Sequence, residues 1–174
     1  DAASIAAMRR DLHAHPELCF EERRTSDVIA QALTDWGIPV IRGLGKTGVV
    51  GVIKNGTSSR GVALRADMDA LPMTEHNTFA HASKFQGRMH ACGHDGHTAM
   101  LLAAAKNLSK HRNYDGTVYL AFQPAEFSSF QAGLDGRYSG IGVWLRSAQD
   151  GEVYLGSVAG PGPGPRVLLA IFGI

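Results

Sequence analysis

Four potential metal ligands lie within eight residues near the middle of the chain. The segment "MHACGHDGH" supplies His90, Cys92, His94 and His97. Thiolate and imidazole groups are protein ligands of zinc and related divalent metals. Cys92 and His94 are two residues apart, a spacing that places both side chains on the same side of an extended or turning segment. The sequence therefore predicts a divalent metal site that includes Cys92 and His94.

Carboxylates follow two predicted strands. Asp67 and Asp69 end the run "GVALRADMDALP", and Glu126 ends the run "LAFQPAE". Ligands of open α/β sheets bind outside the carboxyl ends of the strands. There, Asp67 could accept the ring N–H of a metal-bound histidine, and Glu126 could take a proton from an attacking water as a general base. A solvated turn with an Asp cap is the alternative for the Asp67 segment.

Other signals for chemistry are weaker. His13 and His15 are two residues apart, which does not place them on one helix face, and we interpret them as structural or, at most, as substrate contacts. The sequence contains no G-x-S-x-G elbow, no P-loop, no C-x-x-C pair and no H-E-x-x-H helix. Metal-assisted hydrolysis is therefore the chemistry that the residues favour.

The elements that would position these residues alternate along the chain. Apolar spacing predicts helices over 2–14, 25–36 and 94–111, the last with Asp95 as its N-cap. β-Branched runs predict strands within 40–42, 47–56, 60–69 and 116–122. This alternation predicts an α/β fold with a mixed or parallel sheet flanked by helices.

The composition changes after residue 126. Ten of the 21 glycines fall in residues 127–174, and no His, Cys or Lys follows Phe127. Two alternating runs flank Asp150-Gly151, which is a hairpin signal, and "RVLLAIF" reads as a final buried strand. We therefore expect two units: residues 1–126, and a Gly-rich, β-rich tail of unknown origin over 127–174.

Length and charge exclude several classes. A chain of 174 residues can bury one real core. With 17 Lys plus Arg against 16 Asp plus Glu, it has no electrostatic footprint for nucleic acid or an anionic membrane. Its apolar stretches are too short to span a bilayer, and no signal-peptide pattern is present. Two cysteines do not make a disulfide framework, so we expect a reducing, cytoplasmic location.

Four motifs in order resemble one known family. "LHAHPELCFEE", "GVALRADMDALPM", "MHACGHDGHTAMLLAAA" and "GTVYLAFQPAE" look like the M20 metallopeptidases, in particular their amidohydrolase branch of hippurate, N-acyl-amino-acid and auxin-conjugate hydrolases. The resemblance covers residues 5–126, the first third of a family member. It implies that this chain is part of an M20-type catalytic domain. Complete family members also carry an inserted lid domain, which often dimerises.

The resemblance also implies roles for individual residues. Members hydrolyse the amide bond of small N-acyl amino acids with two divalent ions, commonly manganese, zinc, cobalt or nickel. Cys92 and His94 would then be metal ligands, and Asp67 the acidic residue that orients the site. Glu126 would be the general base that deprotonates the attacking water and passes the proton to the leaving amine.

The sequence departs from the family pattern immediately after Glu126. The second glutamate of the family, a metal ligand, is Phe127 here, and the later histidine ligands have no counterpart because no histidine follows His111. We therefore expect at most one bound ion, and a truncated enzyme that is weakly active or inactive alone. The lid has no counterpart, which leaves homo-oligomer formation open. The alternatives are a non-catalytic metal-binding module and an incomplete interaction fragment.

Overall fold

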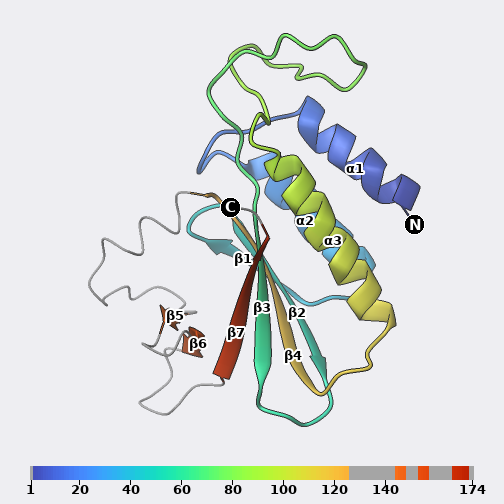
Figure 1. Ribbon diagram of the computed structural model, residues 1–174, viewed down its shortest axis with the longest axis vertical. Coiled ribbons are helices and arrows are strands. Elements are labelled where there is room, and N and C mark those ends of the chain that lie inside the picture. The colour runs from blue at the N-terminus through green and yellow to red at the C-terminus, as the bar shows by residue number, and fades with distance from the viewer. Residues whose placement is uncertain (1, 126–143, 148–152, 157–165, 173–174) are drawn as a thin grey trace.

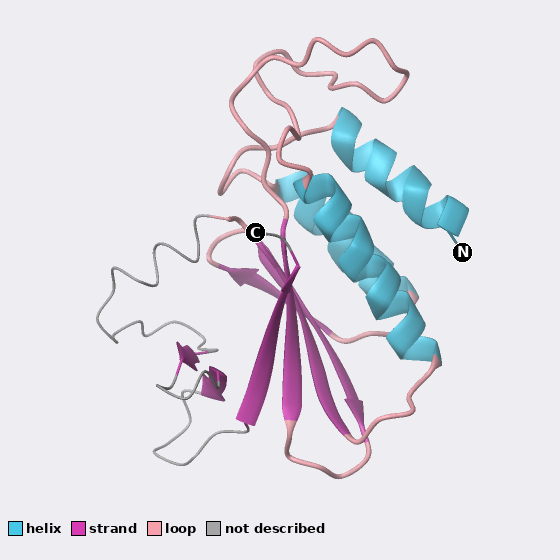
Figure 2. Ribbon diagram, viewed as in Figure 1, coloured by secondary structure: helices cyan, strands magenta, loops and turns pink. Residues whose placement is uncertain are grey.

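A mixed sheet carries three helices on one side (Figures 1 and 2). The computed structural model describes residues 2–125, 144–147, 153–156 and 166–172. The helices are α1 (Ala2–Ala14), α2 (Arg23–Asp35) and α3 (His94–Lys110). The strands are β1 (Val40–Leu44), β2 (Gly48–Asn55), β3 (Gly61–Asp67), β4 (Gly116–Gln123), β5 (Trp144–Ser147), β6 (Val153–Gly156) and β7 (Arg166–Phe172). The predicted α/β class is confirmed, and the sheet is mixed.

The order of strands in the sheet is β1-β2-β4-β3-β7-β6-β5. β3 pairs in parallel with β4 and with β7, whereas the remaining neighbours are antiparallel. β3, α3 and β4 form a βαβ unit, so the carboxyl ends of β3 and β4 meet at one edge, where Asp67 is paired with Gln123. This edge is where the sequence places its carboxylates.

The core lies between the sheet and the helices. β4 alternates buried and half-buried residues along its whole length, and its buried residues include Leu120 and Phe122, both fully buried. Ile29 and Leu33 of α2 are four residues apart and also fully buried, as an amphipathic helix requires. α2 and α3 pack on the sheet and α1 packs on α3. The apolar pattern thus fixes α3 against the strand that carries Asp67.

One predicted helix start is wrong in detail. Gly93, with a φ of 83°, is the N-cap residue of α3, and no side chain caps the helix there. Asp95 lies one residue inside the helix, is 1% exposed and bonds to α1 instead. Glycine adopts this left-handed backbone without strain, and a long-range contact therefore replaces the local cap.

Of the predicted tail over 127–174, the described residues include only three short strands. β5 and β6 pair antiparallel, as expected of the hairpin predicted around Asp150-Gly151, but that turn lies outside the described residues. β7 covers the predicted final strand and extends the sheet beside β3. Among the helices of the described ranges, none is long and apolar enough to cross a membrane.

A long connection joins β3 to α3 and holds the site segments at its two ends. Leu71 and Met89 form an antiparallel bridge, with N–H···O distances of 2.9 and 3.1 Å. The bridge closes residues 72–88 into a loop that projects beyond the carboxyl end of the sheet, beside the end of α1 (Figure 1). The aspartates before this loop and the Cys/His segment after it are thereby brought together.

Candidate metal centre

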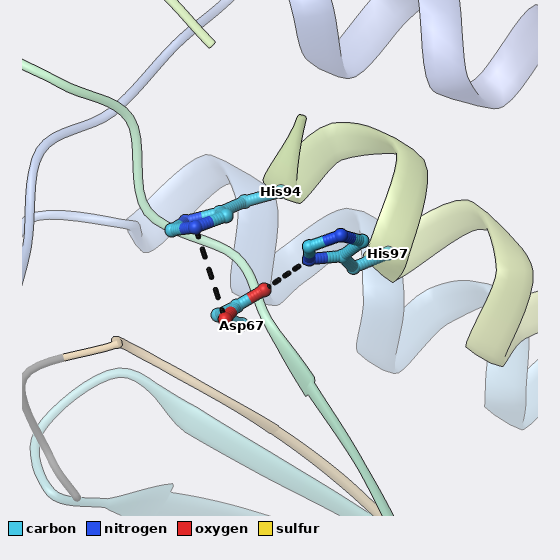
Figure 3. Close-up of side chains that lie close together, drawn as sticks. All are labelled: Asp67, His94 and His97. Carbon is cyan, nitrogen blue, oxygen red and sulfur yellow. Dashed lines mark hydrogen bonds and ion pairs between the residues drawn. The ribbon is translucent and has the colours of Figure 1, made fainter. Parts of the chain in front are cut away.

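Three side chains converge where β3 ends and α3 begins. Asp67 is the last residue of β3, and His94 and His97 lie in the first turn of α3. Figure 3 shows both rings projecting from the helix toward the Asp67 carboxylate. One potential ligand atom from each residue lies within 4.8 Å of the other two. The predicted chemistry at the strand end therefore has a specific place in the fold.

The ring of His94 is oriented by Asp69. Its Nδ1 lies 2.8 Å from the backbone oxygen of Asp69 and 3.2 Å from its Oδ1. A carbonyl oxygen only accepts, so Nδ1 carries the proton. In the neutral ring, Nε2 is then the atom with a free lone pair, and it lies 3.8 Å from Asp67 Oδ2. Metal-binding histidines are commonly held in this way by a carbonyl or carboxylate.

His97 bonds directly to Asp67. Its Nδ1 donates to Asp67 Oδ1 over 2.6 Å, a short, charge-assisted hydrogen bond. Thr98 Oγ1 donates to the backbone oxygen of Asp67 over 3.1 Å, which ties the same turn of α3 to β3. The prediction that Asp67 accepts a ring N–H is thus met by His97, with Asp67 Oδ2 turned toward His94.

The ends of β3 and β4 are fastened to each other. Asp69 Oδ1 accepts the backbone N–H of Ala125 over 2.8 Å. Arg65 Nη2 donates to the backbone oxygen of Pro124 over 3.3 Å, and its Nη1 lies 3.6 Å from Asp67 Oδ2. The last described residue before Glu126 is therefore held against the aspartate pair.

Charge and burial shift two pKa values at this edge. Burial alone would raise the pKa of Asp69, but the hydrogen bonds from His94 and Ala125 outweigh it and lower that pKa below 3.8. Burial would likewise lower the pKa of His94, but the Asp69 hydrogen bond and the charges of Asp67 and Asp69 raise it above 6.5. Asp69 therefore stays ionised at neutral pH, and its charge attracts cations to the edge.

These donors fit a divalent cation. Two imidazoles and a carboxylate match zinc, manganese and cobalt in ligand type. His94 Nε2 and Asp67 Oδ2 face each other with their other atoms already held by protein groups. His94 Nε2 and Asp67 Oδ2 are therefore the two atoms that a small ion could bridge, with Arg65 Nη1 also 3.6 Å from Asp67 Oδ2.

The other predicted ligand lies outside this group, and the predicted base lies outside the described residues. Cys92 is exposed and is not among the three clustered residues. Glu126 lies outside the described residues. Among the predicted residues, the structure therefore brings together His94 and Asp67, and the roles of Cys92 and Glu126 stay predictions.

His90 is buried beside the site without a hydrogen bond. It is 4% exposed, and neither ring nitrogen has a partner within the part of the chain that is described. Burial lowers its pKa to about 4, against the opposing charge of Asp95. The ring is therefore neutral at neutral pH.

Two contacts of the site could not be predicted from the sequence: Asp69 with His94, and Asp67 with His97. Asp69 is marked in the sequence as a strand-end carboxylate. Its hydrogen bond to His94, 25 residues later, forms only because the 72–88 loop closes. His97 was recognised as a ligand type but not as the partner of Asp67. The sequence signal that places His97 at the site is its spacing of three from His94 in a strong helix pattern, because residues at this spacing share a helix face.

Comparison with known proteins relates the chain to peptidases and amidohydrolases. The family model described as peptidase family M20/M25/M40 matches residues 63–160. Hippurate hydrolase of Campylobacter jejuni is 50% identical over 119 residues, which are 68% of this chain and 31% of that protein. N-acyl-L-amino acid amidohydrolase of Geobacillus stearothermophilus is 49% identical over 123 residues, 70% of this chain and 33% of that protein.

A solved structure supports the same placement. The YXEP protein of Bacillus subtilis, described as a dinuclear metal-binding peptidase of the M20 family, matches with a TM-score of 0.69 and 41% identity. The match covers 75% of this chain and 39% of that protein. The chain thus spans about a third of the length of the curated relatives given above.

Proposed function

The chain belongs to peptidase family M20/M25/M40, an enzyme family, and on that premise we propose that it hydrolyses the amide bond of N-acyl amino acids, hippurate-like substrates included. The relatives named as hippurate hydrolase and N-acyl-L-amino acid amidohydrolase support this substrate class. The observation that carries the proposal is the orientation of His94. Its Nδ1 is held by Asp69, and its Nε2 faces the Asp67 carboxylate.

In this proposal a divalent ion binds at the edge of the sheet. Asp67, His94 and His97 form the group that the geometry supports, and Cys92 joins His94 by family resemblance. When bound, manganese, zinc, cobalt or nickel would polarise the amide carbonyl and acidify water. The family uses two ions, as the name of the Bacillus subtilis relative says of that protein, but we propose at most one here because Phe127 stands where the second glutamate belongs.

In this proposal Asp67, Asp69 and Glu126 have separate roles in hydrolysis. Asp67 orients His97 through the 2.6 Å hydrogen bond and lends its other oxygen to the site. Asp69 keeps His94 in the tautomer that leaves Nε2 free. Glu126 is the proposed general base, which takes a proton from water and returns it to the leaving amine. It follows Ala125, whose N–H is held by Asp69.

We further propose that hydrolysis by this chain alone is weak. The reason is Phe127, which stands where the resemblance implies a second, metal-binding glutamate. The second candidate function is a non-catalytic metal-binding module. It is favoured by the Asp67, His94 and His97 group, which is complete without Glu126.

Hydrolysis assays with hippurate and acetylated amino acids test the proposal. With added manganese, cobalt or zinc, we expect detectable release of the amino acid at well below about one turnover per second, an ordinary enzyme rate. Glu126→Gln should abolish it, and Glu21→Gln, an exposed glutamate, should not. No release with any metal would favour the metal-binding module, and unchanged release in Glu126→Gln would remove Glu126 as the base.

Three wider proposals follow from the sequence. Residues 1–126 and 127–174 are two units, and the second does not supply the lid domain of the family. The cysteine usage favours a cytoplasmic location. Small N-acyl amino acids are the proposed partners, with no nucleic acid and no membrane, and homo-oligomer formation is left open.

A further inference from the structure

His13 lies between two carboxylates that come from different parts of the fold. Its Nδ1 is 2.9 Å from Asp95 Oδ2, and its Nε2 is 3.2 Å from Glu75 Oε1. All three side chains are buried, with 7% of His13, 2% of Glu75 and none of Asp95 exposed. His13 ends α1, Asp95 begins α3 and Glu75 lies in the 72–88 loop, so one ring joins three segments.

Both ring nitrogens must carry a proton for both contacts to be hydrogen bonds. An ionised carboxylate only accepts, so each of its partners has to donate. Burial would raise the pKa of Glu75, but hydrogen bonds from Asn77, Ser83 and His13 outweigh it and lower that pKa below 4.5. Glu75 is therefore ionised at neutral pH, and the geometry points to an imidazolium at His13 with two charge-assisted bonds.

The groups around this ring balance its charge. Arg9 of α1 donates its Nε to Asp95 Oδ2 over 3.1 Å. His81 contacts the His13 ring edge-on at 5.7 Å, and His90 lies 6.2 Å away, centre to centre. The half-exposed Arg9 thus contacts Asp95 from the solvent side, while the buried His13 contacts both Asp95 and Glu75.

The network anchors the loop that separates the two halves of the site. Ser83 N donates to Glu75 Oε2 over 2.6 Å, which ties the two sides of the loop together. Lys84 N donates to the backbone oxygen of Ala14 over 3.0 Å, next to His13. The loop is therefore fastened to the end of α1 by both side-chain and backbone bonds.

The same network fixes the start of α3. Gly93 provides no side-chain cap, and the buried Asp95 carboxylate is the group that ties the first turn to α1, whereas Thr98 ties it to β3. His94 precedes Asp95 directly, and His97 lies two residues beyond it. Any rotation of the turn about Asp95 displaces both rings from Asp67.

We propose that His13 is a positioning residue for the metal centre: as an imidazolium held between Asp95 and Glu75, it sets the rings of His94 and His97 against Asp67. This inference rests on the proposed function, because it assigns His13 to the same site. The inference goes beyond the proposed function, because within the described residues His13 forms no hydrogen bond or ion pair with Asp67, His94 or His97.

Nitrogen-15 NMR of the metal-free chain tests the charge and the coupling. At neutral pH, both ring nitrogens of His13 should show protonated shifts. In His13→Gln and His13→Ala, the Nδ1–H signal of His97 should change, because its bond to Asp67 loosens. His15→Gln is the matched control, because His15 directly follows α1 but contacts Asp11 and Lys84 instead, and it should leave His97 unchanged. A neutral His13 ring, or an unchanged His97 in both folded variants, would overturn the proposal.

Metal titration gives the second readout. Calorimetry with Mn²⁺ or Zn²⁺ should show affinity reduced roughly 10-fold in His13→Ala, the low end of the effect of losing a direct partner of a metal ligand, because His13 acts through Asp95. His13→Gln, which keeps one hydrogen bond, should lie between the parent and His13→Ala. Affinity in His13→Gln equal to that of the parent would also overturn the proposal.

The two proposals fail in different ways. If the parent chain binds no ion, the proposed function fails, while the NMR signals of the metal-free chain still decide the role of His13. If the variants do not fold by circular dichroism, the ring shifts of His13 in the parent remain decisive. A doubly protonated ring supports the proposal and a neutral ring rejects it.

Discussion

His97 Nδ1 lies 2.6 Å from Asp67 Oδ1, across 30 residues of sequence. This hydrogen bond joins the first turn of α3 to the carboxyl end of β3, the two elements that carry the candidate metal ligands. It also leaves Asp67 Oδ2 facing His94 Nε2 at 3.8 Å. The geometry of the site therefore depends on Asp67 as the residue that both histidines share.

Asp67→Asn should weaken metal binding while preserving the fold. Asparagine keeps the size of the side chain and one accepting oxygen but removes the negative charge that a cation requires. We expect the dissociation constant for Mn²⁺ or Zn²⁺ to rise roughly 10- to 100-fold, measured by calorimetry. The control is Asp35→Asn at the exposed end of α2, which should leave binding unchanged. Equal affinity in Asp67→Asn and the parent would exclude Asp67 from the site.

The neutral ring of His94 should carry its proton on Nδ1. The backbone oxygen of Asp69 can only accept, so it selects this tautomer. Long-range nitrogen–proton NMR of the metal-free chain, at a pH high enough to leave the ring neutral, distinguishes the two forms. His111 is exposed and serves as the reference ring. A proton on Nε2 of His94 would mean that the ring is turned away from metal binding.

Glu22→Gln should stabilise the chain at neutral pH more than at acid pH. Burial raises the pKa of Glu22 above 4.5, despite the hydrogen bond of 2.7 Å that its Oε2 accepts from Thr47 Oγ1. Between the unfolded and the folded pKa, the folded state holds more protons, so stability falls as pH rises through that window. Glutamine removes this loss, so the stability of Glu22→Gln relative to the parent should rise from acid to neutral pH.

Chemical unfolding of the metal-free chain at several pH values measures this difference. Glu21→Gln is the matched control, because Glu21 is the adjacent residue and is exposed. It should shift stability little and without the same pH dependence. A gain in Glu22→Gln that is constant from acid to neutral pH would show that the Glu22 carboxyl does not titrate with a raised pKa.

Much of the fold was predictable because its signals are local. The β-branched residues of β2 and the apolar stripe of α3 mark elements without reference to the rest of the chain. Gly37, with a φ of 70°, follows the end of α2, where glycine readily adopts the left-handed backbone that ends a helix. The carboxylates at strand ends predicted the edge that carries the site, since parallel strands must align their carboxyl ends.

The pairings within the site were not predictable because they depend on tertiary contacts. Asp95 has the sequence of a local helix cap, yet its carboxylate bonds to His13, 82 residues away. His13 has a neighbour at the wrong spacing for a shared helix face, and its partners come from the loop and from α3. Only the packing of α1 on α3 brings these groups together.

Metal binding to the 174-residue chain tests the central claim most directly. After dialysis against trace metal, we predict about one divalent ion per chain, held with roughly micromolar affinity or better. His94→Ala should abolish retention and His97→Ala should weaken it, while Cys92→Ser decides whether the exposed thiol also binds. A folded parent chain that retains no ion, or a His94→Ala variant that binds as the parent does, would contradict the assignment of this edge of the sheet as a metal centre.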